Sequence, residues 1–111
     1  MKTTLAGEDI ELNFTFKRVD AIEKDIGSLY GYPTKCVNKS VTASDIVSIY
    51  YNAQEAAYSK EKIFEKILAD GLINHITLTY DIIMRLSVGE KLTKQLEEAK
   101  DLEEANGSEK K

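Results

Sequence analysis

Cysteine and histidine are almost missing from this sequence. Cys36 and His75 are the single residues of their kinds among 111. One cysteine cannot form a disulfide within the chain, and one thiol plus one imidazole falls short of the ligand set of a typical zinc site. Stability must therefore come from packing, and we expect neither a metal nor another cofactor.

Long apolar runs are missing as well. No stretch approaches the roughly 18 apolar residues that a transmembrane helix needs. The first residues, MKTTLAGEDIEL, also lack the apolar centre of a signal peptide. The sequence therefore predicts a cytoplasmic protein that does not contact a membrane.

Positive charge is in deficit. Fifteen Lys and Arg residues stand against 19 Asp and Glu residues, which gives a formal net charge of −4. A chain of that sign gains no counterion release from a phosphate backbone. No nucleic-acid partner is expected.

What the sequence contains suits one small globular domain. It is 42% hydrophobic and 31% charged, which is ordinary for a folded protein, and its length leaves room for one core. We place this domain at residues 1–88 and a charged helical or disordered tail at residues 89–111. The predicted fold class is α+β but mostly α, with a small N-terminal β-hairpin packed on a bundle of about four helices.

The most informative stretch is EDIELNFTFKRVDAIEKDIG, residues 8–27. Ile10 and Leu12 alternate with polar residues, which is typical of a half-exposed strand, and residues 6–9 suit a tight turn. A helix is predicted from about Thr15 to a stop at Gly27. Its apolar residues recur every three or four positions and predict one buried stripe, formed by Phe16, Val19, Ile22 and Ile26.

The middle of the chain is predicted to be a loop followed by a central helix. Residues 28–41 contain glycine, proline and asparagine without a sustained period, which favours a loop. Thr42 and Asp45 have the spacing of a capping box, so a helix should begin there. The predicted inward face of this helix consists of Ile46, Ile49, Tyr50, Ala53 and Ala57, and is widened by Val47 and Tyr51.

The last part of the domain is less clear. A helix is predicted from Ser59 to Gly71, with Ile63, Phe64, Ile67 and Leu68 facing inward. Residues 72–86 fit a strand by alternation and a helix by the spacing of Leu72, Ile76, Tyr80 and Ile83. A strand of that length would be unusual and would have no partner but the hairpin. We therefore expect a helix.

Candidate chemistry is sparse. A Cys36–His75 pair could act as nucleophile and base, but a lone cysteine among tyrosines typically serves as a small apolar side chain, and a lone histidine as a hydrogen-bonded polar residue. The spacing of Gly27, Gly31 and Pro33 does not fit a phosphate loop. Paired acids in the tail have no apolar pocket to raise their pKa. We do not expect an enzyme.

The order of the predicted elements resembles that of a known family. A hairpin leads into a helix of the form Phe16-x4-Ala21-x-Glu23-x3-Gly27, followed by a loop, a capped central helix, a helix ending at Gly71 and a last apolar helix. Over residues 5–90 this layout resembles the small tail assembly chaperones of long-tailed bacteriophages, in particular the branch shared with gene transfer agents.

The resemblance implies a non-enzymatic function. Such chaperones coat the long, apolar tape measure protein in the host bacterial cytoplasm until tail tube subunits replace them. The implied partners are a tape measure protein, tail tube subunits and further copies of the chain, bound through many weak contacts. The implied contact surface consists of Phe14, Phe16, Val19, Ile46, Tyr50 and Phe64.

A second hypothesis comes from a different class of protein. The chain would be a small homodimeric adaptor or regulatory protein-binding module. Its central and last helices would form a core shared by two copies, and its tail would pair as a short coil. A strict dimer in solution without affinity for long helical partners would favour this alternative.

Overall fold

The computed structural model describes residues 1–89, 95, 98 and 99 of the chain. Within these residues it contains two strands, five α-helices and one short 3-10 helix. The predicted fold class is confirmed, because helices dominate and the two strands form a single N-terminal hairpin. The predicted tail, residues 89–111, lies almost wholly outside the described residues.

The hairpin consists of β1 (Lys2–Leu5) and β2 (Glu8–Glu11), which pair antiparallel with Leu5 opposite Glu8. The turn is tighter than predicted, since only residues 6 and 7 connect the strands, and both have a positive φ, as two-residue hairpin loops commonly require. Ile10 and Leu12 are buried, as the alternation predicted.

The first helix, α1 (Phe16–Ile26), begins after Thr15 and ends at Gly27, whose φ of +86° favours glycine. Ile22 is fully buried, but the prediction for Phe16 is wrong: its side chain is 89% exposed. The buried stripe begins one turn later than predicted, because Phe14 in the preceding connector already packs against the core.

The predicted loop at residues 28–41 is wrong in its first part. A 3-10 helix, η1 (Leu29–Gly31), leads directly into α2 (Tyr32–Val37), with proline in the first turn where its fixed φ suits a helix. Lys35 donates from Nζ to the carbonyl oxygen of Ile26 at 3.0 Å and so ties α2 to the end of α1. Buried Tyr32 anchors the segment.

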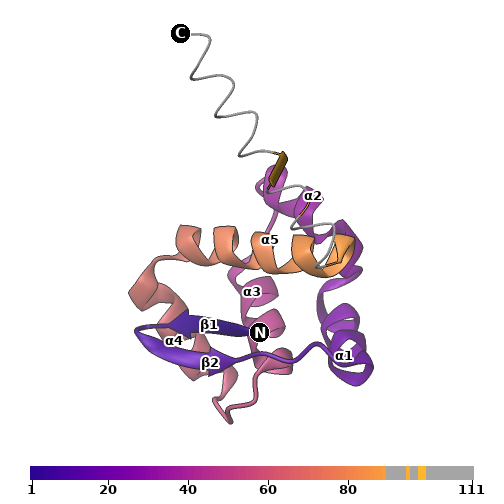
Figure 1. Cartoon of the computed structure of the whole chain (residues 1–111). Helices are drawn as coiled ribbons and strands as arrows, with labels where there is room; N and C mark the ends of the chain where they lie inside the picture. Colours follow the sequence, from indigo (N-terminus) through magenta and orange to yellow (C-terminus); the bar gives the residue numbers. More distant parts are fainter. Residues whose placement is uncertain (90–94, 96–97, 100–111) are drawn as a thin grey trace, which may run out of the picture.

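The central helix is α3 (Ala43–Ala53), which begins at the predicted capping box. It packs against α1, α4 (Lys60–Asp70) and α5 (Leu72–Val88). Figure 1 shows α3 in the middle of the fold, with α5 crossing one end, α1 along one side and the hairpin near α4 on the other. Its buried residues are Ile46, Val47, Ser48, Ile49, Tyr50 and Ala53.

The predicted extension of this helix to Ala57 is wrong. The chain turns to an extended conformation at Gln54, which pairs with Leu12 in an isolated β-bridge. Asn13 also donates its backbone N–H to the carbonyl oxygen of Ala53 at 2.8 Å. Pairing with the connector after β2 therefore ends α3, and Ala57 lies exposed beyond it.

The inward face of α4 is rotated relative to the prediction. Ile63 and Ile67 are buried, but Phe64 is 39% and Leu68 54% exposed. Lys66 takes an inward position instead, with its Nζ 2.9 Å from a carboxylate oxygen of Glu8 in the hairpin. An ion pair to the hairpin is thus buried at a lysine that the sequence pattern placed on the solvated face of this helix.

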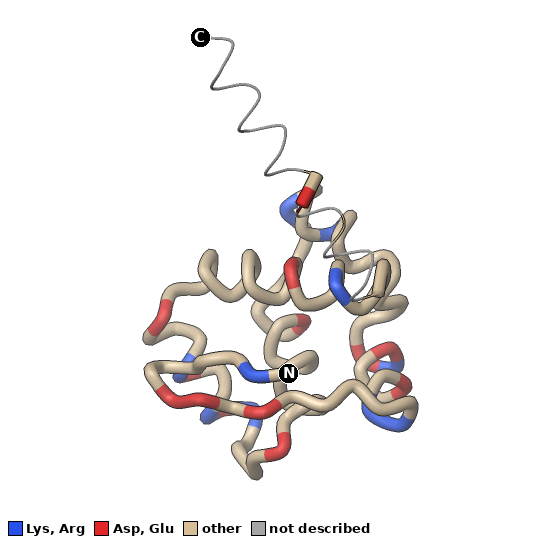
Figure 2. The backbone as a smooth tube through the Cα atoms, viewed as in Figure 1, with Lys and Arg blue, Asp and Glu red and all other residues tan. Residues whose placement is uncertain are grey.

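The prediction of a helix at residues 72–86 is confirmed by α5. Its buried residues are His75, Thr79, Ile82 and Ile83, so the inward face includes two polar side chains, while Leu72 and Ile73 are exposed. Lys, Arg, Asp and Glu are interspersed over much of the described fold, but α5 carries none of them before Asp81 (Figure 2). Within the described residues, no helix combines the length and the apolar content needed to cross a membrane.

Candidate functional site

An apolar hollow lies where α1, η1 and the end of α5 meet. Its volume is about 350 Å³. We call this hollow the α1–α5 groove; it is lined by Phe14, Val19, Leu29, Tyr30, Ile83, Leu86 and Ser87. None of its lining residues is charged, so the groove suits an apolar side chain better than an ionic ligand.

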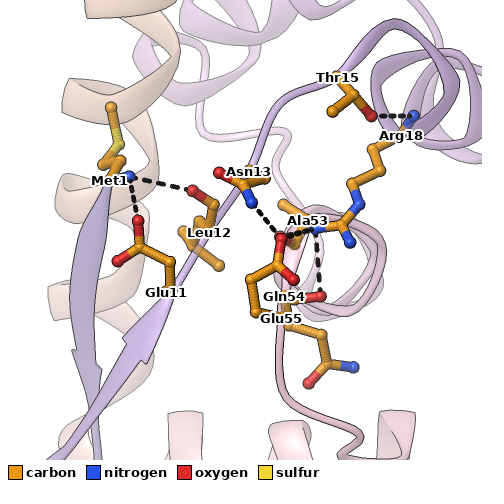
Figure 3. Close-up of polar contacts among 9 residues, drawn as sticks. All are labelled: Met1, Glu11, Leu12, Asn13, Thr15, Arg18, Ala53, Gln54 and Glu55. Atoms are coloured by element: carbon orange, nitrogen blue, oxygen red, sulfur yellow. Dashed lines mark hydrogen bonds and ion pairs between the residues drawn. The ribbon is translucent and has the colours of Figure 1, made fainter.

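The connector before α1 places Phe14 in the groove. Leu12 is buried on one side of the connector. Asn13 is fixed by its backbone bond to Ala53 and by a side-chain hydrogen bond to the carboxylate of Glu55 (Figure 3). Phe14, the next residue, is only partly exposed and packs against the core. Backbone pairing between the connector and the end of α3 therefore sets the position of this aromatic side chain.

Arg18 fastens α1 to the end of α3. Its Nη1 donates to the carbonyl oxygen of Ala53 at 2.9 Å and pairs with a carboxylate oxygen of Glu55 at 2.9 Å (Figure 3). Hydrogen bonds from Asn13 and then from Arg18 lower the pKa of the Glu55 carboxyl. Because Val19 is the next residue of α1, this clamp also positions one side of the groove.

The segment after α1 supplies the opposite rim. Gly27 redirects the chain, and the backbone N–H of Leu29 donates to a carboxylate oxygen of Glu23 at 2.9 Å. Leu29 is buried, whereas Tyr30 is 84% exposed. The groove thus has an apolar floor and a large aromatic side chain that is available to a binding partner.

A line of buried hydrogen bonds holds α5 against α2 and α3. The hydroxyl of Thr79 donates to the carbonyl oxygen of His75 at 2.7 Å, so the hydroxyl of Tyr32, also 2.7 Å away, donates to Thr79. Burial raises the pKa of Tyr32 well above its ordinary value and keeps its proton in place. α5 cannot slide by one turn without breaking these bonds.

His75 continues this line toward the hairpin. Its Nδ1 lies 2.8 Å from the hydroxyl of Tyr50, and its Nε2 lies 2.6 Å from a carboxylate oxygen of Asp70. Asp70 also accepts the backbone N–H of Ala6 at 2.9 Å. These contacts lower the pKa of Asp70, with the bond from Ala6 as the largest cause. An ionised carboxylate only accepts, so Nε2 of His75 carries a proton and donates to Asp70.

A larger hollow between α1, α3 and α4 is less suited to an apolar partner. Its volume is about 450 Å³, and its lining mixes apolar side chains such as Phe64 with the charged residues Asp25, Asp45, Lys60 and Glu61. Asp25 already accepts from the hydroxyl of Ser48 at 2.8 Å. Asp45 accepts the backbone N–H of Thr42 at 3.0 Å, and the Nζ of Lys60 lies 5.2 Å from the ring centre of Tyr51.

The six sequence-predicted contact residues do not form one surface. Phe14 and Val19 lie together in the α1–α5 groove, Phe16 is exposed on the first turn of α1, and Phe64 lines the other hollow. The structure places Ile46 and Tyr50 in the core, with none of their surface exposed. These two residues cannot contact a partner while the domain keeps this fold.

Of the residues that line the groove, only Phe14 and Val19 were among the predicted contact residues. Leu29 and Tyr30 fell in the predicted loop, and Leu86 and Ser87 lie at the end of α5, where periodicity alone left the secondary structure open. The available signal was the tyrosine-rich composition of residues 28–36. That Leu29 and Tyr30 would lie beside the end of α5 depends on the tertiary packing.

The Cys36–His75 pair that the sequence analysis considered and set aside is not formed. Both ring nitrogens of His75 bond Tyr50 and Asp70 rather than Cys36. Burial also raises the pKa of the Cys36 thiol, which disfavours the reactive thiolate. Among the described residues, no group of three or more His, Cys, Asp or Glu side chains could hold a metal ion.

Comparison of the chain with protein-family models, with curated proteins and with solved structures finds no match in any of the three.

Proposed function

We propose that this chain is a phage or prophage tail assembly chaperone that binds an apolar helix of a tape measure protein in its α1–α5 groove. The protein would act without enzymatic chemistry in the cytoplasm of the host bacterium. The observation that carries this proposal is the groove itself, which is uncharged, partly open and bordered by the exposed Tyr30.

The groove suits a helical partner. Helix-in-groove binding uses a few apolar anchors that enter an apolar hollow from one helix face. A volume of about 350 Å³ has room for one or two such side chains, not for a whole interface. Single contacts of this size are weak, and a chaperone that tail tube subunits must displace needs weak contacts repeated over many copies.

The arrangement of elements also supports the proposal. The resemblance to tail assembly chaperones depends on the order of the elements. That order is the hairpin, α1, the capped α3, α4 ending before Gly71, and the long α5. The segment between α1 and α3 differs from that layout, because it contains η1 and α2. This addition contributes Leu29 and Tyr30 to the groove.

The homodimeric adaptor remains the alternative prediction. α3 and α5 pack against each other and bury Ile49, Tyr50 and Ile83 within a single chain. A core shared between two copies is therefore not needed to cover these side chains. No contact in the described residues specifically favours the adaptor.

A matched pair of substitutions tests the proposal. Leu86→Glu places a charge in the groove, and Leu68→Glu places the same charge on α4, outside the groove; the two leucines are 40% and 54% exposed. The partner is the product of a neighbouring long open reading frame with tape-measure-like helical repeats, co-expressed with the chain. We expect Leu86→Glu to lower recovery of the complex at least tenfold and Leu68→Glu to leave it unchanged.

Two results would overturn the proposal. One is equal loss of the complex in both variants, because binding would then not depend on the groove. The other is a coding neighbourhood of ordinary metabolic genes without a tape-measure-like reading frame.

A further inference from the structure

The hollow between α1, α3 and α4 differs from the α1–α5 groove in its chemistry. We call it the acidic hollow; its volume is about 450 Å³, and its acidic lining residues are Asp25, Asp45 and Glu61. Each of these carboxylates comes from a different one of the three helices. In the part of the chain that the structure describes, the residues lining this hollow are all different from those lining the groove. The two surfaces are therefore separate.

The acidic hollow also has an apolar lining, formed mainly by Ile26, Val47 and Phe64. Val47 is almost wholly buried, whereas Phe64 is 39% exposed. A ligand that carries only charge would leave the ring of Phe64 in water. The side chain of an arginine or lysine suits both parts of the lining, because its stem is apolar and its head is cationic.

Asp25 is the carboxylate that gains most from an added cation. It lies in the last turn of α1, where the negative end of the helix dipole disfavours a carboxylate. Its Oδ2 accepts from the hydroxyl of Ser48 at 2.8 Å and from the side-chain amide of Asn52 at 3.4 Å, and both donors are neutral. The bond from Ser48 is the largest cause of the lowered pKa of Asp25, so this carboxyl is ionised at neutral pH.

The neighbouring charges leave the hollow acidic. Asp45 lies 4.0 Å from the Nζ of Lys35, so its charge is partly compensated. Lys60 lines the hollow, but its Nζ lies over an aromatic ring, and its charge contributes least to the lowered pKa of Asp25. Among the described residues, no lysine or arginine forms an ion pair with Asp25 or Glu61. These two carboxylates favour a cationic partner.

We propose that the acidic hollow binds an arginine side chain from a helix of a partner protein, with the guanidinium held by Asp25. Arginine suits the site better than lysine, because its guanidinium is more weakly hydrated, stacks on aromatic rings such as that of Phe64 and offers several N–H donors to carboxylates. One partly exposed ion pair is too weak to retain a small cation, whereas a helix also covers the exposed part of Phe64. This inference does not rest on the proposed function.

The test uses the full chain and a pair of synthetic peptides. Each peptide is a helix of about 18 residues built from alanine and glutamine; one carries a central arginine, and its twin carries citrulline, which has nearly the same shape without the charge. Neither offers the large apolar anchors that the α1–α5 groove requires. Nuclear magnetic resonance follows the methyl signals of Ile26 and Val47 and the ring signals of Phe64. We expect only the arginine peptide to shift them, and its binding to weaken as salt screens the charges.

A matched pair of variants assigns the charge. Asp25→Asn removes the charge and keeps an oxygen that can accept from Ser48. Asp20→Asn removes the same charge from the same helix, outside the hollow, where Asp20 pairs with Lys24 at 2.9 Å. We expect Asp25→Asn to bind the arginine peptide about fivefold more weakly than the unchanged chain, which is the upper range for an exposed ion pair. Asp20→Asn should bind it as the unchanged chain does.

Glu61→Gln provides a second variant in case Asp25→Asn folds poorly. Glu61 is exposed and forms no ion pair among the described residues, so its loss should leave the fold intact. We expect a smaller but measurable loss of affinity for the arginine peptide, because the second carboxylate of the hollow is gone. Glu65→Gln, on the same helix but outside the hollow, is its control.

Three results would overturn the inference. The first is that the arginine peptide does not bind, or binds no better than the citrulline peptide. The second is equal affinity in each variant and its control. The third is that butylguanidinium binds as tightly as the peptide, because a free cation would then be the occupant. The comparison of Leu86→Glu with Leu68→Glu uses other residues and another partner, so its outcome is independent of these.

Discussion

Asp70 connects three elements through a single carboxylate. It accepts a backbone N–H from the hairpin turn at Ala6 and the Nε2–H of His75, and His75 in turn bonds Tyr50 of α3. Hydrogen bonds to an ionised acceptor are stronger than neutral ones. One residue at the end of α4 therefore contributes to the docking of both the hairpin and α5.

The lowered pKa of Asp70 makes this contribution depend on pH. A carboxyl whose pKa is depressed in the folded state stabilises the fold above its unfolded value, 3.8, and this stability is lost as the pH falls through the lower folded value. We expect Asp70→Asn to reduce the free energy of unfolding at pH 7, and the difference from the unchanged chain to shrink below about pH 4. Urea unfolding between pH 7 and pH 3 measures both.

Glu65→Gln is the control for this pH series. It removes one carboxylate from the same helix, where Glu65 pairs with Lys62 at 3.8 Å on the exposed side. A difference between Asp70→Asn and the unchanged chain that stays constant down to pH 3 would contradict the assigned role of the ionised carboxylate.

At the scale of elements, the helix starts show how local signals succeed. Thr42 and Asp45 form both bonds of a capping box, at 3.1 Å and 3.0 Å. Thr15 makes a single, longer bond of 3.4 Å to the backbone N–H of Arg18. Both starts were predictable, because a capping residue acts within three positions of the sequence.

These two caps should differ in their contributions to stability. We expect Thr42→Ala to lower the free energy of unfolding by about 1 kcal/mol or more, and Thr15→Ala by less, since it removes one long bond rather than a reciprocal pair. Thermal and urea unfolding of the two variants measure the difference. An equal loss in both would show that the capping box adds nothing to a single cap.

The inward faces of α4 and α5 show why pattern alone fell short. Apolar spacing favoured Phe64 and Leu68 as inward residues, but Lys66, His75 and Thr79 are buried instead. Each of these polar groups bonds a residue on another element, Glu8, Tyr50 or Tyr32. The spacing of apolar residues cannot predict which polar side chains are buried. A buried polar group needs a hydrogen-bond partner, and here each partner lies 25 or more residues away in the sequence.

At the scale of the whole molecule, the Arg18 clamp joins the N-terminal connector, α1 and the end of α3. Arg18 has its side chain about one third exposed and bonds two groups of that region at 2.9 Å. Long charged side chains stabilise through such hydrogen bonds and through packing of their stems. The clamp also helps to position two residues that line the groove, because Phe14 precedes Arg18 by four residues and Val19 directly follows it.

Removing the clamp should therefore affect both stability and binding. We expect Arg18→Met to lower the free energy of unfolding by roughly 1–3 kcal/mol and to weaken the partner complex, although Arg18 does not line the groove. Lys17→Met is the matched control on an exposed position of the same helix. Chemical unfolding and the co-expression assay measure the two effects, and equal behaviour of the variants would contradict the role given to Arg18.

The sequence by itself determined the hairpin, the starts of α1, α3 and α4, the stops at Gly27 and Gly71, and the dominance of helix. Each of these features follows from residues within a few positions of one another, because caps, glycine stops and periodicity act locally. Only the tertiary structure decided that residues 29–37 are helical, that α3 ends at Ala53, and that Phe14 and Val19 meet Leu86 while Ile46 and Tyr50 are enclosed. These outcomes depend on hydrogen bonds and packing between segments distant in the sequence, which no local pattern encodes.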